Sequence, residues 1–356
     1  MHIRDLHAVI LAGGHGTRFW PASRRALPKQ FLPIAGRRTL IAQTAARLRG
    51  LVDLEHTLVV TSADHVALVE RFLPKLPREN ILAEPVGRNT AACVAWAALE
   101  IEKRSPGGVH AVLPSDHVIE PAREFRRVLA AAADEAAETG ALYTLGIRPT
   151  SPATGYGYIE GGEVVSDHPG IEVRRVIKFV EKPDRARAEV FVASGRFFWN
   201  AGIFVWSTRA ILSALREHAP DLLGSLAGIH AESERPRVYA ALRSVAVDVA
   251  VLEKAQNVRV IPIAFTWSDV GSWAALSDVH ALDADQNCAA GGGRVLAHEA
   301  QRNIVYGKRG ELTALVGVHD LVVVRAGKAV LVCPRERAQD VKSIVARLEQ
   351  GDPSFL

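Results

Sequence analysis

Buried strands and amphipathic helices alternate along the first half of the chain. Short apolar runs rich in β-branched residues predict strands, and apolar residues repeated every three to four positions predict helices. The predicted strands are 7–11, 56–61, 80–83, 109–113 and 141–147, and the predicted helices are 39–48, 65–73, 89–103 and 124–138. This alternation is typical of βαβ units around a mainly parallel sheet.

The pattern changes in the second half of the chain. Residues 155–206 are strand-rich with short turns, and the spacing of apolar residues predicts helices over 209–226 and 239–253, followed by a strand over 258–265. A small, polar stretch at 283–293 predicts a boundary, with one domain over 1–285 and a second over 286–356. The second domain is predicted to contain short strands, for example 320–324 and 329–332, and a terminal helix over 338–348. A stack of β-turns is an alternative that the weak periodicity does not establish.

A glycine-rich turn follows the first predicted strand directly. Residues 7–33 read HAVILAGGHGTRFWPASRRALPKQFLP. Glycines allow close approach of the backbone to a ligand, and successive N–H groups in such a turn form an anion-binding nest. Arg18 and Lys29 add positive charge, so we predict a phosphate cradle here, with an ordinary tight turn as the alternative. The turn lacks the Gly-Lys-Ser/Thr ending of a P-loop and the direct entry into a helix of a dinucleotide fingerprint.

Two aspartates follow predicted strands that are far apart in the chain. Asp116 lies in Leu-Pro-Ser-Asp-His (113–117), and Asp269 lies between Trp267 and Gly271. In open α/β sheets ligands bind beyond the carboxyl ends of the strands. Carboxylates are ligands that Mg²⁺ prefers, with substrate phosphates and waters completing the shell. A turn or helix-capping aspartate is the alternative for Asp116.

The string GG-x-GTR-x-W-P-x-S-R, followed by P-K-Q-F-L, resembles the signature of the sugar-phosphate nucleotidyltransferases, and most of all that of the mannose-1-phosphate guanylyltransferases. The resemblance extends over residues 7–348. It implies a Rossmann-like, glycosyltransferase-A-like α/β fold with a mixed, mainly parallel sheet and a small β-rich C-terminal domain. It also implies transfer of GMP from GTP to α-D-mannose 1-phosphate, giving GDP-mannose and pyrophosphate with the help of Mg²⁺.

Residue roles follow from the resemblance, motif by motif. It implies catalytic roles for Arg18, Lys29 and Lys182, nucleotide binding by Leu11, Ala12, Gly13, Gly14, Gly16, Thr17, Glu84, Pro85, Asn89, Thr90 and Ser115, sugar-phosphate binding by Gly157, Glu181 and Asn200, and metal binding by Asp116 and Asp269. A carboxylate such as that of Glu84 can accept hydrogen bonds from guanine N1–H and the 2-amino group, which adenine does not offer together. Taken singly, these motifs also have ordinary structural explanations, such as a helix cap at Asn89. His15 and His117 lie beside predicted site residues without an assigned role.

Composition narrows the class of protein further. The net charge of +4 in 356 residues is too small to predict nucleic-acid binding. No apolar run reaches the roughly 20 residues of a membrane span, so no membrane association is expected. The widely spaced Cys93, Cys288 and Cys333 fit reduced thiols in a cytoplasmic protein.

The sequence leaves the exact activity and the oligomeric state open. The chain stops at Leu356, which leaves no room for the isomerase domain of longer family members, so transferase activity alone is expected. The same chemistry on another hexose 1-phosphate or nucleotide is a near rival, and a non-catalytic sugar-nucleotide sensor is a distant one, because fold alone does not define function. A homodimer is left open.

Overall fold

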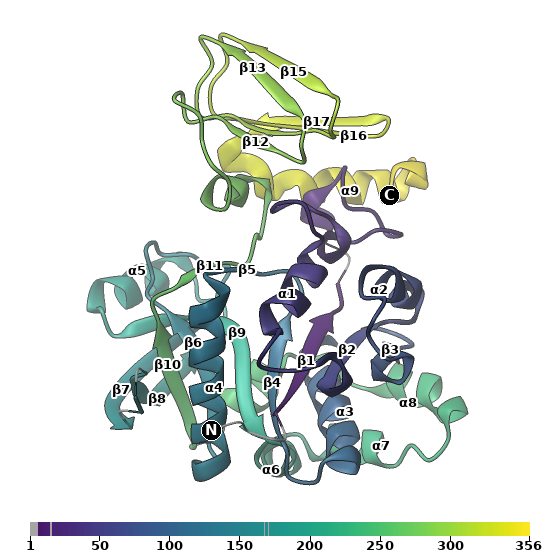
Figure 1. Cartoon of the computed structure of the whole chain (residues 1–356), viewed down its shortest axis with the longest axis vertical. Coiled ribbons are helices and arrows are strands. Elements are labelled where there is room, and N and C mark those ends of the chain that lie inside the picture. Colours follow the sequence, from purple (N-terminus) through teal and green to yellow (C-terminus); the bar gives the residue numbers. More distant parts are fainter. Residues whose placement is uncertain (1–5, 15, 167, 170) are drawn as a thin grey trace.

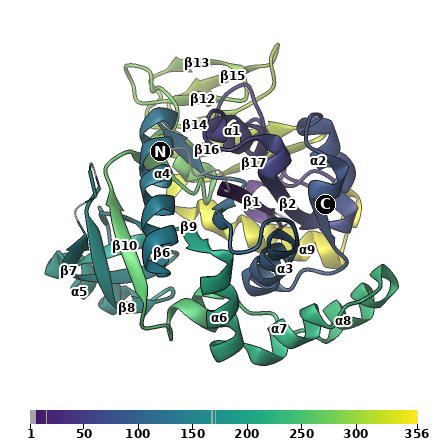
Figure 2. The same cartoon turned by 60° about the horizontal axis from the view of Figure 1, so that its bottom comes forward.

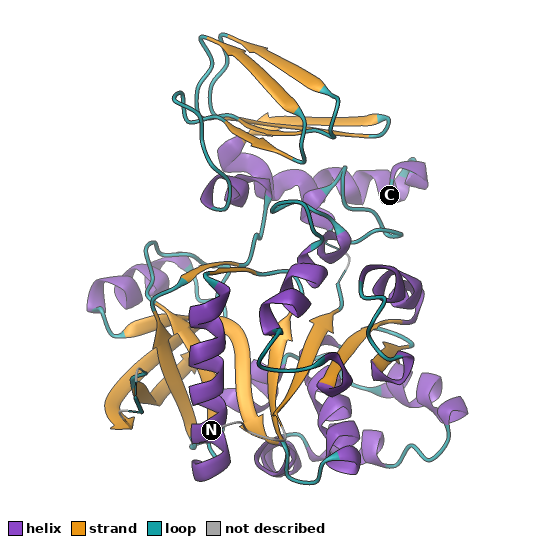
Figure 3. Cartoon of the chain, viewed as in Figure 1, coloured by secondary structure: helices purple, strands orange, loops and turns teal. Residues whose placement is uncertain are grey.

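A computed structural model of the chain describes residues 6–14, 16–166, 168–169 and 171–356. A twisted sheet with helices on both faces forms the larger part of the molecule, and a small β-rich domain lies at one end of it (Figures 1 and 3). The C-terminal helix α9 (Val341–Gln350) lies between these two parts (Figure 1). His15, which the sequence places beside the predicted phosphate cradle, is outside the described residues.

The large sheet has the strand order β3-β2-β1-β4-β9-β6-β10-β8-β7. Its strands are β1 (Leu6–Ala12), β2 (Thr57–Ser62), β3 (Ile81–Glu84), β4 (Val109–Pro114), β6 (Leu142–Ile147), β7 (Tyr158–Ser166), β8 (Val173–Val180), β9 (Phe197–Ser207) and β10 (Val258–Ile263). Strands β3, β2, β1 and β4 are parallel, whereas β9 runs antiparallel between β4 and β6. The mixed, mostly parallel sheet predicted from the sequence is confirmed.

Helices cover both faces of this sheet, as the second view shows (Figure 2). They are α1 (Leu40–Leu48), α2 (Val66–Phe72), α3 (Asn89–Arg104), α4 (Ala122–Thr139), α5 (Arg185–Ser194), α6 (Thr208–His218), α7 (Pro220–Ala227) and α8 (Arg235–Ala241). Side chains alternate along β1: Ala8 and Ile10 enter the core with α1, α2 and α4, and Val9 enters the opposite core with α3, α6 and α7. Because both faces are covered, β1 is an almost continuous apolar run.

Some predicted elements are wrong. The helix predicted over 239–253 is not continuous, since α8 ends at Ala241 and only a π-helical turn, Asp248–Leu252, follows. The helix predicted over 209–226 is interrupted before Pro220, which begins α7 because proline has no N–H to continue α6. The region predicted to be strand-rich also contains α5.

The C-terminal domain is a short parallel coil of strands. Strands β12 (Cys288–Ala290), β14 (Ile304–Tyr306), β16 (Leu321–Ala326) and β17 (Ala329–Pro334) form one sheet, and β13 (Arg294–His298) and β15 (Leu312–Val316) form another. The pairs β12–β14, β14–β16 and β13–β15 are all parallel, as expected for successive turns of a solenoid. A 3-10 turn over Arg335–Asp340 then leads into α9. Within the described part of the chain, no helix combines the length and apolar character needed to cross a membrane.

Candidate active site

A two-stranded pairing brings the two predicted metal ligands together. Strand β5 (Val118–Glu120) follows Asp116 closely, and strand β11 (Thr266–Ser268) directly precedes Asp269. The strands pair antiparallel with Ser268 opposite Val118, so the residues just outside the pair meet at the same end. Both aspartates line one cavity of about 300 Å³.

Lys29 lies between the two aspartate segments and is almost fully buried. Its Nζ donates to the backbone oxygens of Asp269 (2.7 Å) and Val270 (2.8 Å) and lies 2.9 Å from Asp116 Oδ2. An ammonium has three donors, so these partners occupy all of them. Lys29 thus lies beside Asp116 and Asp269, and these contacts are all to the protein itself.

Gly16 allows this arrangement. It has a φ of +58°, and a Cβ at this position would lie 2.5 Å from Lys29 Cβ. The glycine turn can therefore press directly against Lys29 only because residue 16 has no side chain.

Charge in the cavity favours ionised aspartate and neutral histidine. Burial raises the pKa of Asp116, but the positive charge of Lys29 and the hydrogen bonds of the carboxylate outweigh this and lower the pKa below its ordinary value. Burial lowers the pKa of His117, against the opposing effect of Asp116 and Asp269. Trp267 Nε1 donates to His117 Nδ1 at 3.1 Å, so the proton of the neutral ring is on Nε2.

The lining of the cavity joins residues from four distant parts of the chain: Gly16, Thr17, Arg18, Phe19, Lys29, Asp116, His117, Asp269, Gly271 and Lys342. Six of these were predicted from the sequence. Lys342 was missed, because an isolated lysine on a terminal helix has no local feature that distinguishes it from a solvent-exposed one. Among the described residues, neither Arg18 nor Lys342 has a hydrogen-bond or ion-pair partner, whereas Lys29 has three.

Hydrogen bonds from Gln30 and Ser115 hold the start of the glycine turn in place. Gln30 Nε2 donates to Ala12 O at 3.0 Å and lies within 3.4 Å of the oxygens of Gly13 and Gly14. The backbone N–H of Ser115 donates to Leu11 O. Gly13, Gly14 and Thr17 remain exposed, so this turn is open to a ligand.

The predicted sugar-phosphate residues form a second group next to the cavity. Asn200 N donates to Gly157 O at 2.8 Å, and a Cβ on Gly157 would lie 2.6 Å from Glu181 Oε2. Lys182 forms an ion pair with Glu181. Tyr156 links this group to the metal-ligand candidates, because its hydroxyl donates to Asp269 Oδ1 at 2.9 Å.

The orientation of the Asn200 amide is determined by its neighbours. Its Oδ1 accepts hydrogen bonds from Thr144 Oγ1 (2.9 Å) and Gly202 N (3.1 Å), and its Nδ2 donates to Asp248 Oδ1 (2.8 Å). Burial, and then the charge of Glu181, raise the pKa of Asp248 to about 6. One amide hydrogen of Asn200 remains, so Asn200 can only donate to a ligand.

The predicted base-reading residues lie at the end of β3 and the start of α3. Glu84 is buried, and burial raises its pKa to about 7, while the neighbouring Cys93 has a smaller effect in the opposite direction. Its Oε1 has no hydrogen-bond partner among the residues that the structure describes. Pro85 follows β3 directly, and Thr90 Oγ1 accepts from Val247 N. The N-cap predicted at Asn89 is wrong: Arg88 occupies the cap position, and Asn89 is the first helical residue, with a φ of +65°.

The donor set fits a hard divalent cation. Asp116 Oδ2 contacts Lys29 and Asp269 Oδ1 accepts from Tyr156, so each carboxylate keeps one further oxygen. One or two carboxylates plus substrate phosphates and waters is the usual environment of Mg²⁺ in proteins. Asp116 and Asp269 are therefore the residues that would hold it.

Two family models match the chain. Residues 7–286 match the model described as "Nucleotidyl transferase", and residues 293–348 match the "MannoseP isomerase/GMP-like beta-helix domain". The first match covers well over half of the chain, so the chain belongs to the nucleotidyl transferase family. The family and fold predicted from the sequence are confirmed.

Individual relatives place the chain more narrowly. It is 38% identical over 356 residues to the mannose-1-phosphate guanylyltransferase of Escherichia coli (strain K12), with 97% of this chain and 73% of that protein covered. It is also 38% identical to the alginate biosynthesis protein AlgA of Pseudomonas aeruginosa, with 96% and 72% covered. A solved structure from Thermus thermophilus, described as a mannose-1-phosphate geranyltransferase, is 36% identical with a TM-score of 0.88 and covers 97% of this chain and 99% of that one. Within the family, the chain is thus similar to the mannose-1-phosphate guanylyltransferases.

Proposed function

We propose that this protein transfers GMP from GTP to α-D-mannose 1-phosphate, with GDP-mannose and pyrophosphate as products. The observation that carries the proposal is the single cavity in which the glycine turn, Arg18 and two carboxylates meet. The group of Gly157, Glu181 and Asn200 is joined to it through Tyr156 and Asp269. A triphosphate on the turn would thus lie beside a sugar phosphate.

The reaction is an in-line attack of a phosphate oxygen of the sugar phosphate on the α-phosphorus of GTP. That oxygen is already ionised at neutral pH, so no strong general base is needed, and catalysis depends on positioning and on charge stabilisation. Arg18 offers its guanidinium to the phosphates, and Lys29 holds the two aspartate segments in place. Mg²⁺ bound by Asp116 and Asp269 would supply neutralisation of the charge on the phosphates.

The group of Gly157, Glu181 and Asn200 orients the sugar. Asn200 donates its remaining amide hydrogen to a sugar hydroxyl, and Glu181 accepts from another. Lys182, released from its ion pair with Glu181, neutralises the sugar phosphate. Glu84, whose Oε1 has no partner within the described part of the chain, accepts the guanine N–H groups. We further propose that the protein works in the cytoplasm, where nucleoside triphosphates are available; homodimerisation stays a prediction.

The test is release of pyrophosphate from a panel of nucleoside triphosphates and sugar 1-phosphates with Mg²⁺. We expect GTP with mannose 1-phosphate to give the highest kcat/KM. Equal rates with UTP or dTTP would contradict the guanine assignment, and a preferred epimeric sugar would contradict the mannose assignment. Binding of sugar nucleotides without turnover of any pair would support the sensor instead.

A further inference from the structure

The cavity contains a cation from the C-terminal domain. Lys342, in the first turn of α9, lines it together with Thr17 and Arg18 of the glycine turn and with Asp116 and Asp269. The site is therefore not built by the nucleotidyl transferase part of the chain alone, since Lys342 lies in the segment that matches the β-helix model.

The position of Lys342 is determined by packing on both sides. Helix α9 contacts the 3-10 turn Thr17–Phe19, which directly follows the glycines. Val341 and Val345 are buried in the same apolar cluster as Phe19 and Trp20. Lys342 directly follows the buried Val341, and Arg18 directly precedes the buried Phe19. Packing of these two apolar side chains against the same cluster holds both cations beside the cavity.

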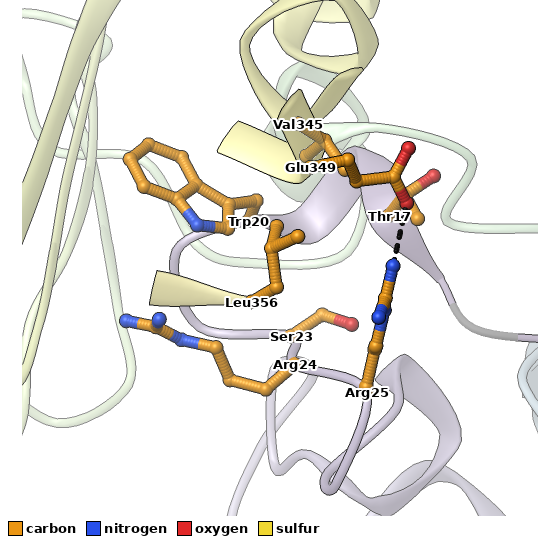
Figure 4. Close-up of a pocket in the computed structure, with 8 residues that line it drawn as sticks. All are labelled: Thr17, Trp20, Ser23, Arg24, Arg25, Val345, Glu349 and Leu356. Carbon is orange, nitrogen blue, oxygen red and sulfur yellow. Dashed lines mark hydrogen bonds and ion pairs between the residues drawn. The ribbon is translucent and has the colours of Figure 1, made fainter. Parts of the chain in front are cut away.

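Polar contacts beyond the helix reinforce this packing. Trp20 Nε1 donates to Phe355 O at 2.8 Å, and Arg24 donates to the same oxygen. Arg25 pairs with Glu349 at 2.9 Å (Figure 4). Figure 4 shows residues of α9 and of the segment after the glycine turn facing one another across a small cavity, so the end of the chain fastens α9 onto that segment.

The charges indicate what Lys342 would bind. The Lys29 ammonium contacts Asp116 and two backbone oxygens. Arg18 and Lys342 are the other two cations that line the cavity, and neither has a hydrogen-bond or ion-pair partner among the described residues. A lysine in the first turn of a helix also adds to the positive end of the helix dipole, an unfavourable place that a bound anion would relieve. A nucleoside triphosphate brings several negative charges, more than Arg18 and one divalent cation can offset.

We propose that Lys342 binds the phosphates of the nucleotide that leave as pyrophosphate, so that the C-terminal domain completes the catalytic site. This rests on the proposed function, because it assigns a substrate group to the same cavity. Lys342 would act on the nucleotide and not on the sugar, and its contribution would depend on charge.

The variants for the test are Lys342→Gln and Lys342→Arg, with Lys328→Gln as the matched control. Lys328 is an exposed lysine of the same domain, in the turn between β16 and β17. For Lys342→Gln we expect kcat/KM for GTP to fall about 10- to 100-fold, at or below the roughly 100-fold lower limit of what loss of one preorganised contact costs in rate. The KM for mannose 1-phosphate should change less than about threefold. Lys342→Arg should restore most of the activity, and Lys328→Gln should match the wild type.

A second measurement separates this inference from the proposed function. Calorimetric titration with inorganic pyrophosphate and Mg²⁺ should show weaker binding for Lys342→Gln than for the wild type, with unchanged thermal unfolding. If the wild type binds pyrophosphate through Lys342 but does not make GDP-mannose, the proposed function fails and this inference stands. If the wild type is active and Lys342→Gln equals it in both measurements, the inference is refuted. A lower Tm with equal losses in Lys342→Arg would show a structural role instead, and would also refute it.

Discussion

Removing the Lys29 ammonium is the perturbation that the structure describes most completely. Lys29→Met keeps a side chain of similar length and deletes the ammonium group, whose Nζ lies 5.4 Å from the centre of the Phe19 ring. The backbone oxygens of Asp269 and Val270 then lose their donor, and the Asp116 carboxylate loses its countercharge. We expect a loss of both stability and turnover, because the same contacts hold the two aspartate segments together.

The stability cost can be worked from these contacts. Each backbone oxygen left without its donor costs about 1 kcal/mol. Breaking a fully buried ion pair costs about 3–5 kcal/mol. The Asp116 side chain is 34% exposed, so solvent screening reduces its share to about 1–2 kcal/mol. The free energy of unfolding should therefore fall by about 3–4 kcal/mol at neutral pH.

The pH dependence has a defined sign. In the folded protein the pKa of Asp116 is held below its unfolded value, so the stability it contributes is present above the unfolded pKa, near 4, and is lost as the pH falls through the folded pKa. The difference between wild type and Lys29→Met should thus narrow in acid and approach the share of the two backbone hydrogen bonds.

Urea unfolding followed by tryptophan fluorescence measures these quantities, in a double-mutant cycle with Asp116→Asn at pH 7.5. The coupling energy should be about 1–2 kcal/mol, while Lys29→Met alone should lose about 3–4 kcal/mol. A coupling energy below about 0.5 kcal/mol together with a total loss below about 1 kcal/mol would refute the idea that Lys29 joins the two segments.

Three further predictions concern the other parts of the site. Asp116→Asn and Asp269→Asn should each raise the Mg²⁺ concentration needed for half-maximal activity, with the double variant scarcely worse than the poorer single; an unchanged Mg²⁺ requirement in either single would exclude a shared ion. Because burial raises the pKa of Glu84 to about 7, its contribution to stability is present at low pH and is lost as the pH rises through about 7, so the wild-type free energy of unfolding should drop by about 2.5 kcal/mol between pH 5 and 8. Glu84→Gln should make the free energy of unfolding, measured with urea, nearly independent of pH in this range, and it should narrow the preference for GTP over ATP. If the variant shows the same pH dependence as the wild type, the assignment of this titration to Glu84 is wrong. Gly157→Ala should displace the Glu181 carboxylate and raise the KM for mannose 1-phosphate about tenfold with the KM for GTP unchanged, whereas equal changes in both constants would place Gly157 outside the sugar site.

The central strands were predictable because burial on both faces leaves a strong sequence signal. Strands β1, β2 and β4 are mostly apolar and almost entirely buried, and their observed ends differ from the predicted ones by one residue. The helices between them carry apolar residues at helical spacing because one face of each packs on the sheet.

The error over 239–253 has a physical cause. Tyr239, Val247, Ala250 and Val251 are all buried in the same cluster, so the apolar spacing reflects burial of a segment that is only partly helical. Between α8 and the π-helical turn, Val245 O accepts from Ala91 N and Val247 N donates to Thr90 Oγ1. These two hydrogen bonds to α3 keep the backbone out of a helical conformation. The spacing of apolar residues in the sequence does not predict them.

The candidate site shows the same division between local and distant information. The glycine turn and the strand-end aspartates are visible in the sequence, but their meeting depends on β5 and β11, two strands of three residues each that are too short to be recognised alone. The sequence also predicts that Lys29 binds phosphate. Only the fold shows that its ammonium group already contacts Asp116 and two backbone oxygens.

The contacts of Lys29 with Asp116 and two backbone oxygens affect which cations are available to bind phosphate in the cavity. If Lys29 is used to hold the aspartates, the phosphates need other cations, and Lys342 is one that comes from outside the sheet. The pairing of Ser268 with Val118 places the carboxylates, and the packing of α9 on the turn Thr17–Phe19 places Lys342. Both contacts join segments more than a hundred residues apart, so the cavity forms only after the sheet and the C-terminal helix have docked. A change in the apolar cluster beneath α9, for example at Val341, should therefore alter nucleotide binding before it alters sugar binding.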